Sequence, residues 1–163
     1  MINKLGSSGA ILVSKLAMIE LAGGMGYRQP NASLTGPCKS PWDKNTWAGG
    51  SSSGSGSAVG TGLVPFAIGS ETWGSILSPA NNCGVSGLRP TFGRVSRYGA
   101  MPLSWSLDKI GPLCLSADDC GIVLNEIAGP DPKDPSASDK LYEYRVGSNQ
   151  RKFKLAVLAS ASS

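Results

Sequence analysis

Residues 49–78 read GGSSSGSGSAVGTGLVPFAIGSETWGSILS, and this stretch decides the fold. Its first part, 49–57, has the composition of a flexible Gly/Ser linker. It runs directly into residues 58–64, which are typical of a helix of small residues, and 65–69, which are typical of a buried strand. A linker does not normally continue straight into core elements. We therefore interpret 49–57 as a shaped loop whose backbone N–H groups receive an anion or an oxyanion.

Two serine turns flank this predicted helix and strand. Ser51 lies in the Gly/Ser loop, and Ser75 lies in a second turn of small residues, 70–76. A helix followed by a returning strand can bring its two ends together at one edge of a sheet. The sequence therefore predicts a site with two serines, against the simpler interpretation that both are ordinary turn residues.

Working outward, the hydrophobic pattern predicts further elements on both sides. Apolar runs favour strands at 10–13, 85–88 and 153–159, and helical spacing favours helices at 15–21 and 118–128. Ser116 is the expected N-cap of the last helix, and Gly129 with Pro130 ends it. Residues 22–48 and 131–139 are typical of loops. Strands that alternate with helices favour an α/β fold.

Composition restricts the class of protein. The chain has 163 residues, with 40% hydrophobic and 16% charged residues, which suits one domain with a packed core. The net charge is +4, but the basic residues are scattered apart from a group near the C-terminus, so we expect a solvated face and no direct nucleic-acid partner. No apolar run reaches a membrane span and no leader is recognisable, so we expect a cytoplasmic protein without a membrane partner.

The sequence contains no histidine, which excludes histidine-dependent nucleophilic triads and histidine-containing zinc sites within this chain. Any nucleophile here needs a different base. The cysteines at 38, 83, 114 and 120 form no C-x-x-C pair, so we expect buried, reduced thiols. We expect neither a metal nor a cofactor.

Residues 79–113 continue as PANNCGVSGLRPTFGRVSRYGAMPLSWSLDKIGPL, and with 49–78 they resemble the amidase signature family of serine hydrolases. The resemblance runs from about Gly9 to Pro135. A phosphate-binding P-loop does not fit, because no Lys-Ser/Thr follows Gly54. The resemblance implies part of a mixed-sheet, helix-flanked α/β fold, truncated at both ends. Residues 1–163 would be a partial domain with its motif core at 49–112 and a polar loop at 130–140.

The resemblance also implies a Ser-cisSer-Lys triad that hydrolyses a small-molecule carboxamide through an acyl-enzyme, without a cofactor. By position, Ser75 matches the nucleophile, and Ser51, after a cis peptide from Gly50, matches the serine that passes its proton toward a neutral lysine. This chemistry fits a chain without histidine, since a desolvated lysine can act as a base. The backbone N–H groups that would form the oxyanion hole are those of Thr72, Trp73, Gly74 and Ser75.

The sequence departs from the family pattern at three places. The family's lysine base lies further upstream of the bridging serine than the residues before Ser51 reach, and Lys15 resembles a different lysine. We therefore expect this chain alone to be inactive or nearly so. Trp73 replaces a glycine, and it would either be strained at a positive φ or narrow the pocket. Glu71 and Leu77 replace an Asp and an Arg, so Glu71 needs another partner or stays solvated.

Three functions remain open. The first is an amidase that releases ammonia or an amine. The second is the glutaminase subunit of a tRNA-dependent amidotransferase, which would have partner subunits. The third is a remnant without a base that serves as a binding or structural domain. For Arg89, Arg94 and Asp108 we expect structural hydrogen bonds rather than catalytic roles.

Overall fold

The computed structural model describes residues 1–23, 29–145, 154 and 156. In chain order, its helices and strands are α1 (Ile2–Ser7), the short 3₁₀ helix η1 (Glu20–Ala22), α3 (Ser53–Gly60), β1 (Phe66–Glu71), α4 (Leu77–Cys83), β2 (Ser86–Gly87), β3 (Lys109–Cys114) and α5 (Ala117–Ile127). The mixture of helices and a central sheet agrees with the predicted α/β class.

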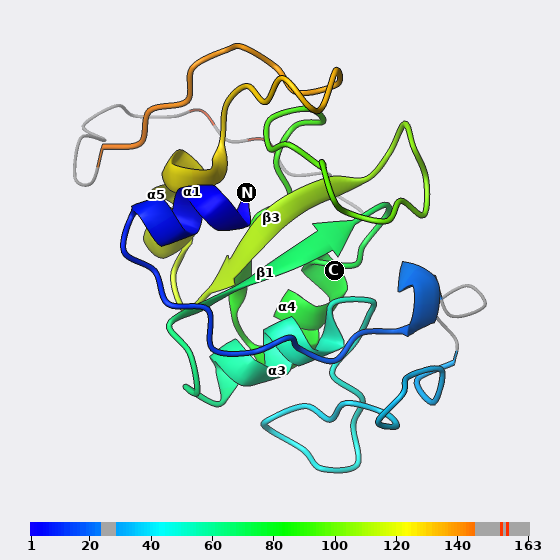
Figure 1. The fold of residues 1–163 in the computed structure, drawn as a ribbon. Coiled ribbons are helices and arrows are strands. Elements are labelled where there is room, and N and C mark those ends of the chain that lie inside the picture. Colours follow the sequence, from blue (N-terminus) through cyan, green and yellow to red (C-terminus); the bar gives the residue numbers. More distant parts are fainter. Residues whose placement is uncertain (24–28, 146–153, 155, 157–163) are drawn as a thin grey trace.

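The described strands form a sheet in the order β1-β3-β2, and both pairings are antiparallel. Phe66 pairs with Cys114 and Glu71 pairs with Lys109. Figure 1 shows α3 and α4 on one side of the β1–β3 pair and α1 and α5 on the other. Since successive side chains of a strand point to opposite faces, β1 contributes Ala67 to one hydrophobic core and Ile68 to the other.

The two cores hold the helices against the sheet. The first contains Val59, Ala67, Ile76, Ala80 and Leu113, all buried. The second contains Val95, Ile110, Leu124 and Ile127, with Ile68 packed against it. The end of β1 and the turn after it therefore lie between layers, and this location positions the serine turns.

The N-terminal predictions at 10–13 and 15–21 were wrong. Residues 10–19 are extended without belonging to a strand, and a 3₁₀ helix forms only at Glu20–Ala22. Ile11, Leu12 and Val13 are exposed rather than paired in the sheet. The backbone of this segment bonds instead to the serine loop: Gly54 N–H donates to Ala17 O at 2.8 Å, and Ile19 N–H donates to Ser51 O at 3.0 Å.

Other predictions hold with shifted boundaries. The helix predicted at 58–64 is α3, which begins earlier, at Ser53, so half of the expected loop is helical. The strand at 65–69 is β1, and that at 85–88 is reduced to the two residues of β2. The helix at 118–128 is α5, and the Ser116 hydroxyl caps it by accepting from Asp119 N–H at 3.1 Å. Apart from residues 154 and 156, the strand predicted at 153–159 lies outside the described residues.

The cysteines are free thiols; Cys83, Cys114 and Cys120 are buried as expected, whereas Cys38 is half-buried. None of the helices in the described part of the chain has the length and hydrophobicity needed to cross a membrane.

Candidate active site

The two serine turns are in direct contact. The backbone N–H of Ser52 donates a hydrogen bond of 3.1 Å to the carbonyl oxygen of Ser75. Ser51 immediately precedes this contact, and Ser51 and Ser75 are 0% and 1% exposed. The fold thus brings together the two turns that the sequence singled out, at the end of β1 and the beginning of α3.

A serine that the sequence reasoning did not single out holds the first turn to the strand. The Ser52 hydroxyl accepts from Ser70 N–H at 3.1 Å and donates to Ser70 O at 3.2 Å. One turn further along α3, the Ser55 hydroxyl donates to Ile68 O at 2.8 Å. A Cβ at Gly69 would lie 2.8 Å from Ser52 Oγ, so glycine allows this close approach of α3 to β1.

Glu71 closes the second turn. One carboxylate oxygen accepts from the backbone N–H groups of Ile76, at 2.7 Å, and Leu77, at 2.8 Å. The other accepts from Arg89 at 3.3 Å. Glu71 has therefore found another partner, as one of the two expectations required, and Arg89 acts structurally. The three bonds fix the loop that carries Ser75, since a buried carboxylate needs its lone pairs satisfied.

The Gly50–Ser51 peptide bond is cis, as the resemblance implied. The Ser51 hydroxyl is buried and makes no hydrogen bond within the described part of the chain. The turns therefore meet, but the Ser51 hydroxyl is not bonded to that of Ser75 in this arrangement.

Trp73 has neither of the two effects expected of it. It is not among the described residues with positive φ, and its indole is 82% exposed and does not line the cavity beside the two turns. Gly74, the next residue, has a φ of 154°. The backbone N–H groups of Trp73 and Gly74 make no hydrogen bond to other described residues. Donors in this state are available to a substrate oxygen.

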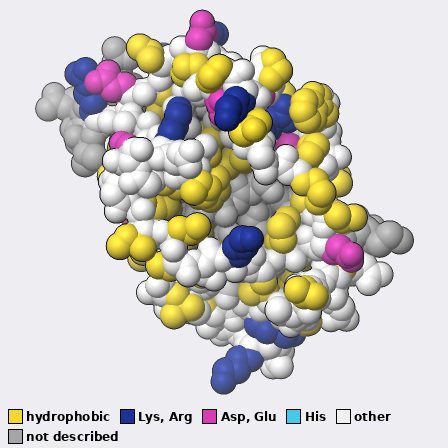
Figure 2. Space-filling view, viewed as in Figure 1, with side chains coloured by type: hydrophobic (Ala, Val, Ile, Leu, Met, Phe, Trp, Pro, Cys, Tyr) yellow, Lys and Arg dark blue, Asp and Glu magenta, His cyan; other side chains and the backbone are white. Residues whose placement is uncertain are grey.

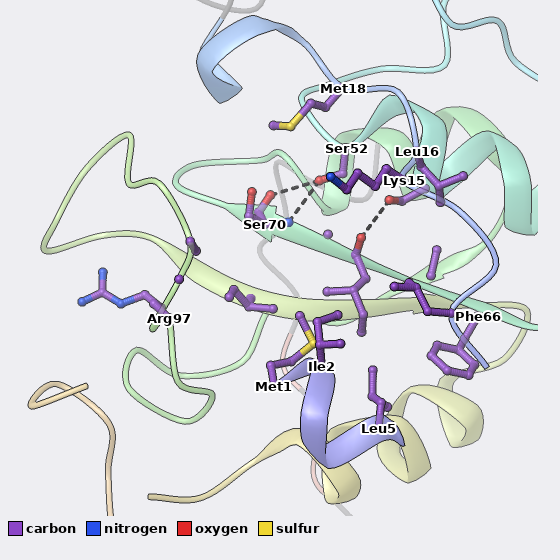
Figure 3. A pocket seen from close by; sticks show the side chains of 18 of the residues that line it. Met1, Ile2, Leu5, Lys15, Leu16, Met18, Ser52, Phe66, Ser70 and Arg97 are labelled. Carbon is purple, nitrogen blue, oxygen red and sulfur yellow. Dashed lines mark hydrogen bonds between the residues drawn. The ribbon is translucent and has the colours of Figure 1, made fainter. Parts of the chain in front are cut away.

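This cavity has a volume of about 1250 Å³. Ser52, Thr72 and Ser75 line it, whereas Ser51 does not. Most of its wall is apolar; Figure 3 shows Met1, Ile2 and Leu5 of α1 facing Phe66 of β1 across it. Figure 2 shows hydrophobic and basic side chains around the middle of the same side of the molecule.

Asp108 supports the polar end of the cavity. Its carboxylate accepts from the Thr72 hydroxyl and from the backbone N–H groups of Leu103, at 2.7 Å, and Ser104, at 3.0 Å. Lys109 donates to the Thr72 carbonyl at 3.2 Å. These bonds hold the 103–108 loop against the end of β1, so Asp108 has the structural role expected of it. Arg94 likewise donates to Lys140 O, at 2.8 Å.

Comparisons with known proteins agree with this geometry. The model of the family named Amidase matches residues 1–163. The chain belongs to the amidase signature family. A subunit of glutamyl-tRNA(Gln) amidotransferase from Deinococcus radiodurans is 45% identical to this amidase signature chain over 144 residues, which are 88% of the chain and 29% of the relative.

Solved structures give the same picture. The glutamyl-tRNA(Gln) amidotransferase subunit from Thermotoga maritima superposes with a TM-score of 0.81 at 40% identity, covering 85% of this chain and 30% of the other. The peptide amidase of Stenotrophomonas maltophilia gives 0.77 at 40% identity, covering 83% and 28%. The fold is therefore that of the matching part of these amidase signature proteins. The chain spans less than a third of the length of each of these relatives.

Proposed function

We propose that this chain carries the two serines of a carboxamide hydrolase site, with Ser75 as the nucleophile and Ser51 as the proton relay. The bond between Ser52 N–H and Ser75 O is the observation that supports it, because it joins the two turns at a cavity that Ser75 lines. Membership of the amidase signature family adds the chemistry that such a pair performs.

In the proposed reaction, the Ser75 oxygen attacks the carboxamide carbon while its proton passes through Ser51 to a neutral lysine. The C–N bond then breaks, the proton moves to the leaving nitrogen, and ammonia or an amine departs. Water hydrolyses the remaining acyl ester to a carboxylate and restores Ser75. The N–H groups of residues 72–75 stabilise the oxyanion, where one donor is typically worth about 3–4 kcal/mol.

The lysine is the part that this chain does not supply in the position that the family implies. The Ser51 hydroxyl, buried without a partner among the described residues, is consistent with a relay whose next member comes from elsewhere. Loss of a triad member lowers the rate by about 10⁴ to 10⁶. We therefore expect the chain alone to show almost no turnover.

The experiment compares this chain with a version extended at the N-terminus by the segment that carries the lysine in the Thermotoga maritima relative. We expect the extended protein to hydrolyse carboxamides and to react at Ser75 with a fluorophosphonate, detected by intact mass. Ser75→Ala should remove both, whereas Ser57→Ala, a control on the exposed side of α3, should change neither. A folded extended protein without amidase activity and with an unreactive Ser75 would favour the remnant interpretation.

The glutaminase subunit of an amidotransferase is a second candidate, because relatives that carry the amidotransferase name are 45% and 48% identical to this chain. It predicts that the extended protein prefers free glutamine over peptide and aryl amides. It also predicts that partner subunits raise the rate of glutamine hydrolysis. Equal turnover of simple amides without partners would support the amidase.

A further inference from the structure

The cavity beside Ser75 has an uneven distribution of charge. The described residues that line it include four basic side chains, those of Lys15, Arg97, Lys109 and Lys133, and two carboxylates, those of Asp108 and Asp134. Both carboxylates are occupied: Asp108 holds Thr72 and the 103–104 backbone, and Asp134 accepts from the N–H groups of Arg97, at 2.7 Å, and Ser136.

Three of the cations also have partners. Lys109 donates to Thr72 O. Arg97 donates to Trp105 O and lies 4.5 Å from the centre of the Phe92 ring, and Lys133 lies 5.1 Å from that of Tyr98. These contacts tie the three side chains to the loops at one end of the cavity.

Lys15 differs from them. Within the described part of the chain, its ammonium group makes no hydrogen bond or ion pair. Figure 3 shows its side chain directed toward the part of the wall formed by Ser52 and Ser70. Its backbone is held two residues away, where Ala17 O accepts from Gly54 N–H at 2.8 Å, and a Cβ at Gly54 would lie 2.5 Å from Ala17 N. The segment therefore presents Lys15 from a fixed position.

The surroundings of Lys15 are apolar. Leu16 and Met18 line the cavity next to it, and Ile2, Leu5 and Phe66 form the opposite side. A cation without a partner in an apolar cavity attracts an anion, because the weakly polar walls screen its charge less than water does. The same wall accommodates a hydrocarbon chain.

We propose that Lys15 determines substrate specificity by binding the carboxylate of a carboxamide whose amide and carboxylate are joined by an apolar chain. The proposal rests on the proposed function, which places the amide carbon at Ser75 in the same cavity. Such a substrate is the monoamide of an aliphatic dicarboxylic acid. The apolar wall contacts its methylene groups, and Lys15 pairs with the end that does not react.

The test measures binding, so it does not depend on turnover. Adipamate and hexanamide have the same chain length and the same amide, but only adipamate has a carboxylate. In calorimetric titrations at about 10 mM ionic strength, where charges are weakly screened, we expect the chain to bind adipamate about tenfold more tightly than hexanamide. Lys15→Gln should reduce this ratio to about one and leave hexanamide binding unchanged, and Lys15→Arg should retain most of it.

Lys44→Gln is the matched control, because Lys44 is exposed and does not line the cavity. Unchanged hexanamide binding by Lys15→Gln shows that the cavity is intact. An unchanged ratio in Lys15→Gln, or no measurable binding of adipamate to the original chain, would overturn the proposal. Ser75 reactivity is measured separately in the extended protein, so failure of the nucleophile and failure of Lys15 recognition are distinguishable.

Discussion

The Arg89 guanidinium lies 3.3 Å from the Glu71 carboxylate, with the Glu71 side chain fully buried and that of Arg89 44% exposed. The same carboxylate accepts from two backbone N–H groups of the turn after Ser75. Arg89 thus compensates a buried charge from the edge of the protein. A carboxylate with three donors of this kind is costly to remove, since each donor loses its acceptor.

Glu71→Ala should therefore lower the free energy of unfolding by about 3–5 kcal/mol, the range for breaking a buried charge pair. Urea denaturation followed by circular dichroism measures the change. Glu143→Ala provides the control, because Glu143 and Arg145 form a pair with side chains 68% and 71% exposed. Pairs of that kind contribute about 0–1 kcal/mol. Equal effects of the two substitutions would contradict the structural role of Glu71.

Gly54→Ala should destabilise the protein although it raises helix propensity. Its Cβ would lie 2.5 Å from Ala17 N and 2.7 Å from Ala17 O, which are backbone atoms that cannot rotate away. Gly6→Ala, in α1, meets nothing within 4 Å and should stabilise by up to about 1 kcal/mol. Thermal unfolding of both variants gives the comparison. A rise in Tm for Gly54→Ala would show that residues 15–19 do not pack on α3.

Cys38 should react with iodoacetamide well before Cys83. Burial, with a smaller contribution from Cys38, raises the pKa of the Cys83 thiol to about 11, so at about pH 8 only about one molecule in a thousand carries the reactive thiolate. Raising the pH toward this pKa increases that fraction. Peptide mass spectrometry after a timed reaction measures each site, with denatured protein as the reference. Equal rates in the native protein would be incompatible with the burial of Cys83.

Trp73→Ala should leave binding in the cavity within about twofold of the original chain, since the exposed indole makes no part of the cavity wall. Stability should also change by less than about 0.5 kcal/mol, as for other surface substitutions. Titration with hexanamide and thermal unfolding measure the two effects. Tighter binding after the substitution would indicate that the indole obstructs the cavity.

Local signals were enough to predict α5. Its cap, Ser116, and its stop at Gly129 and Pro130 act within a few residues, so no distant contact has to be known. The strand predicted at 10–13 failed for the opposite reason. Ile11 and Val13 favour extended backbone, but a strand also needs a hydrogen-bonded neighbour, and the pattern does not supply one.

Strand β3 was not predicted because Gly111 and Pro112 interrupt it, and proline is disfavoured inside sheets. The structure accommodates both residues through Leu88. Leu88 N–H donates to Pro112 O at 3.0 Å, and a Cβ at Gly111 would lie 2.1 Å from Leu88 O. Only the tertiary structure shows these contacts.

The candidate site was predictable in part. The resemblance identified Ser51 and Ser75, and the structure shows their turns in contact. The role of Ser52 was missed, because nothing in a run of serines distinguishes the one whose N–H faces Ser75. The replacement of the expected guanidinium by Arg89 was also hidden, since Arg89 is distant from Glu71 in the sequence.

Helix α3 is built largely from serine and glycine, which gives it little tendency to be helical in isolation. Its order therefore depends on the neighbours that surround it, namely β1, α4 and the extended residues at 15–19. We expect the serine loop, α3 and that segment to gain and lose protection from hydrogen exchange together, as one cooperative unit. A ligand that holds the extended segment in place would thereby also steady the backbone that carries Ser51.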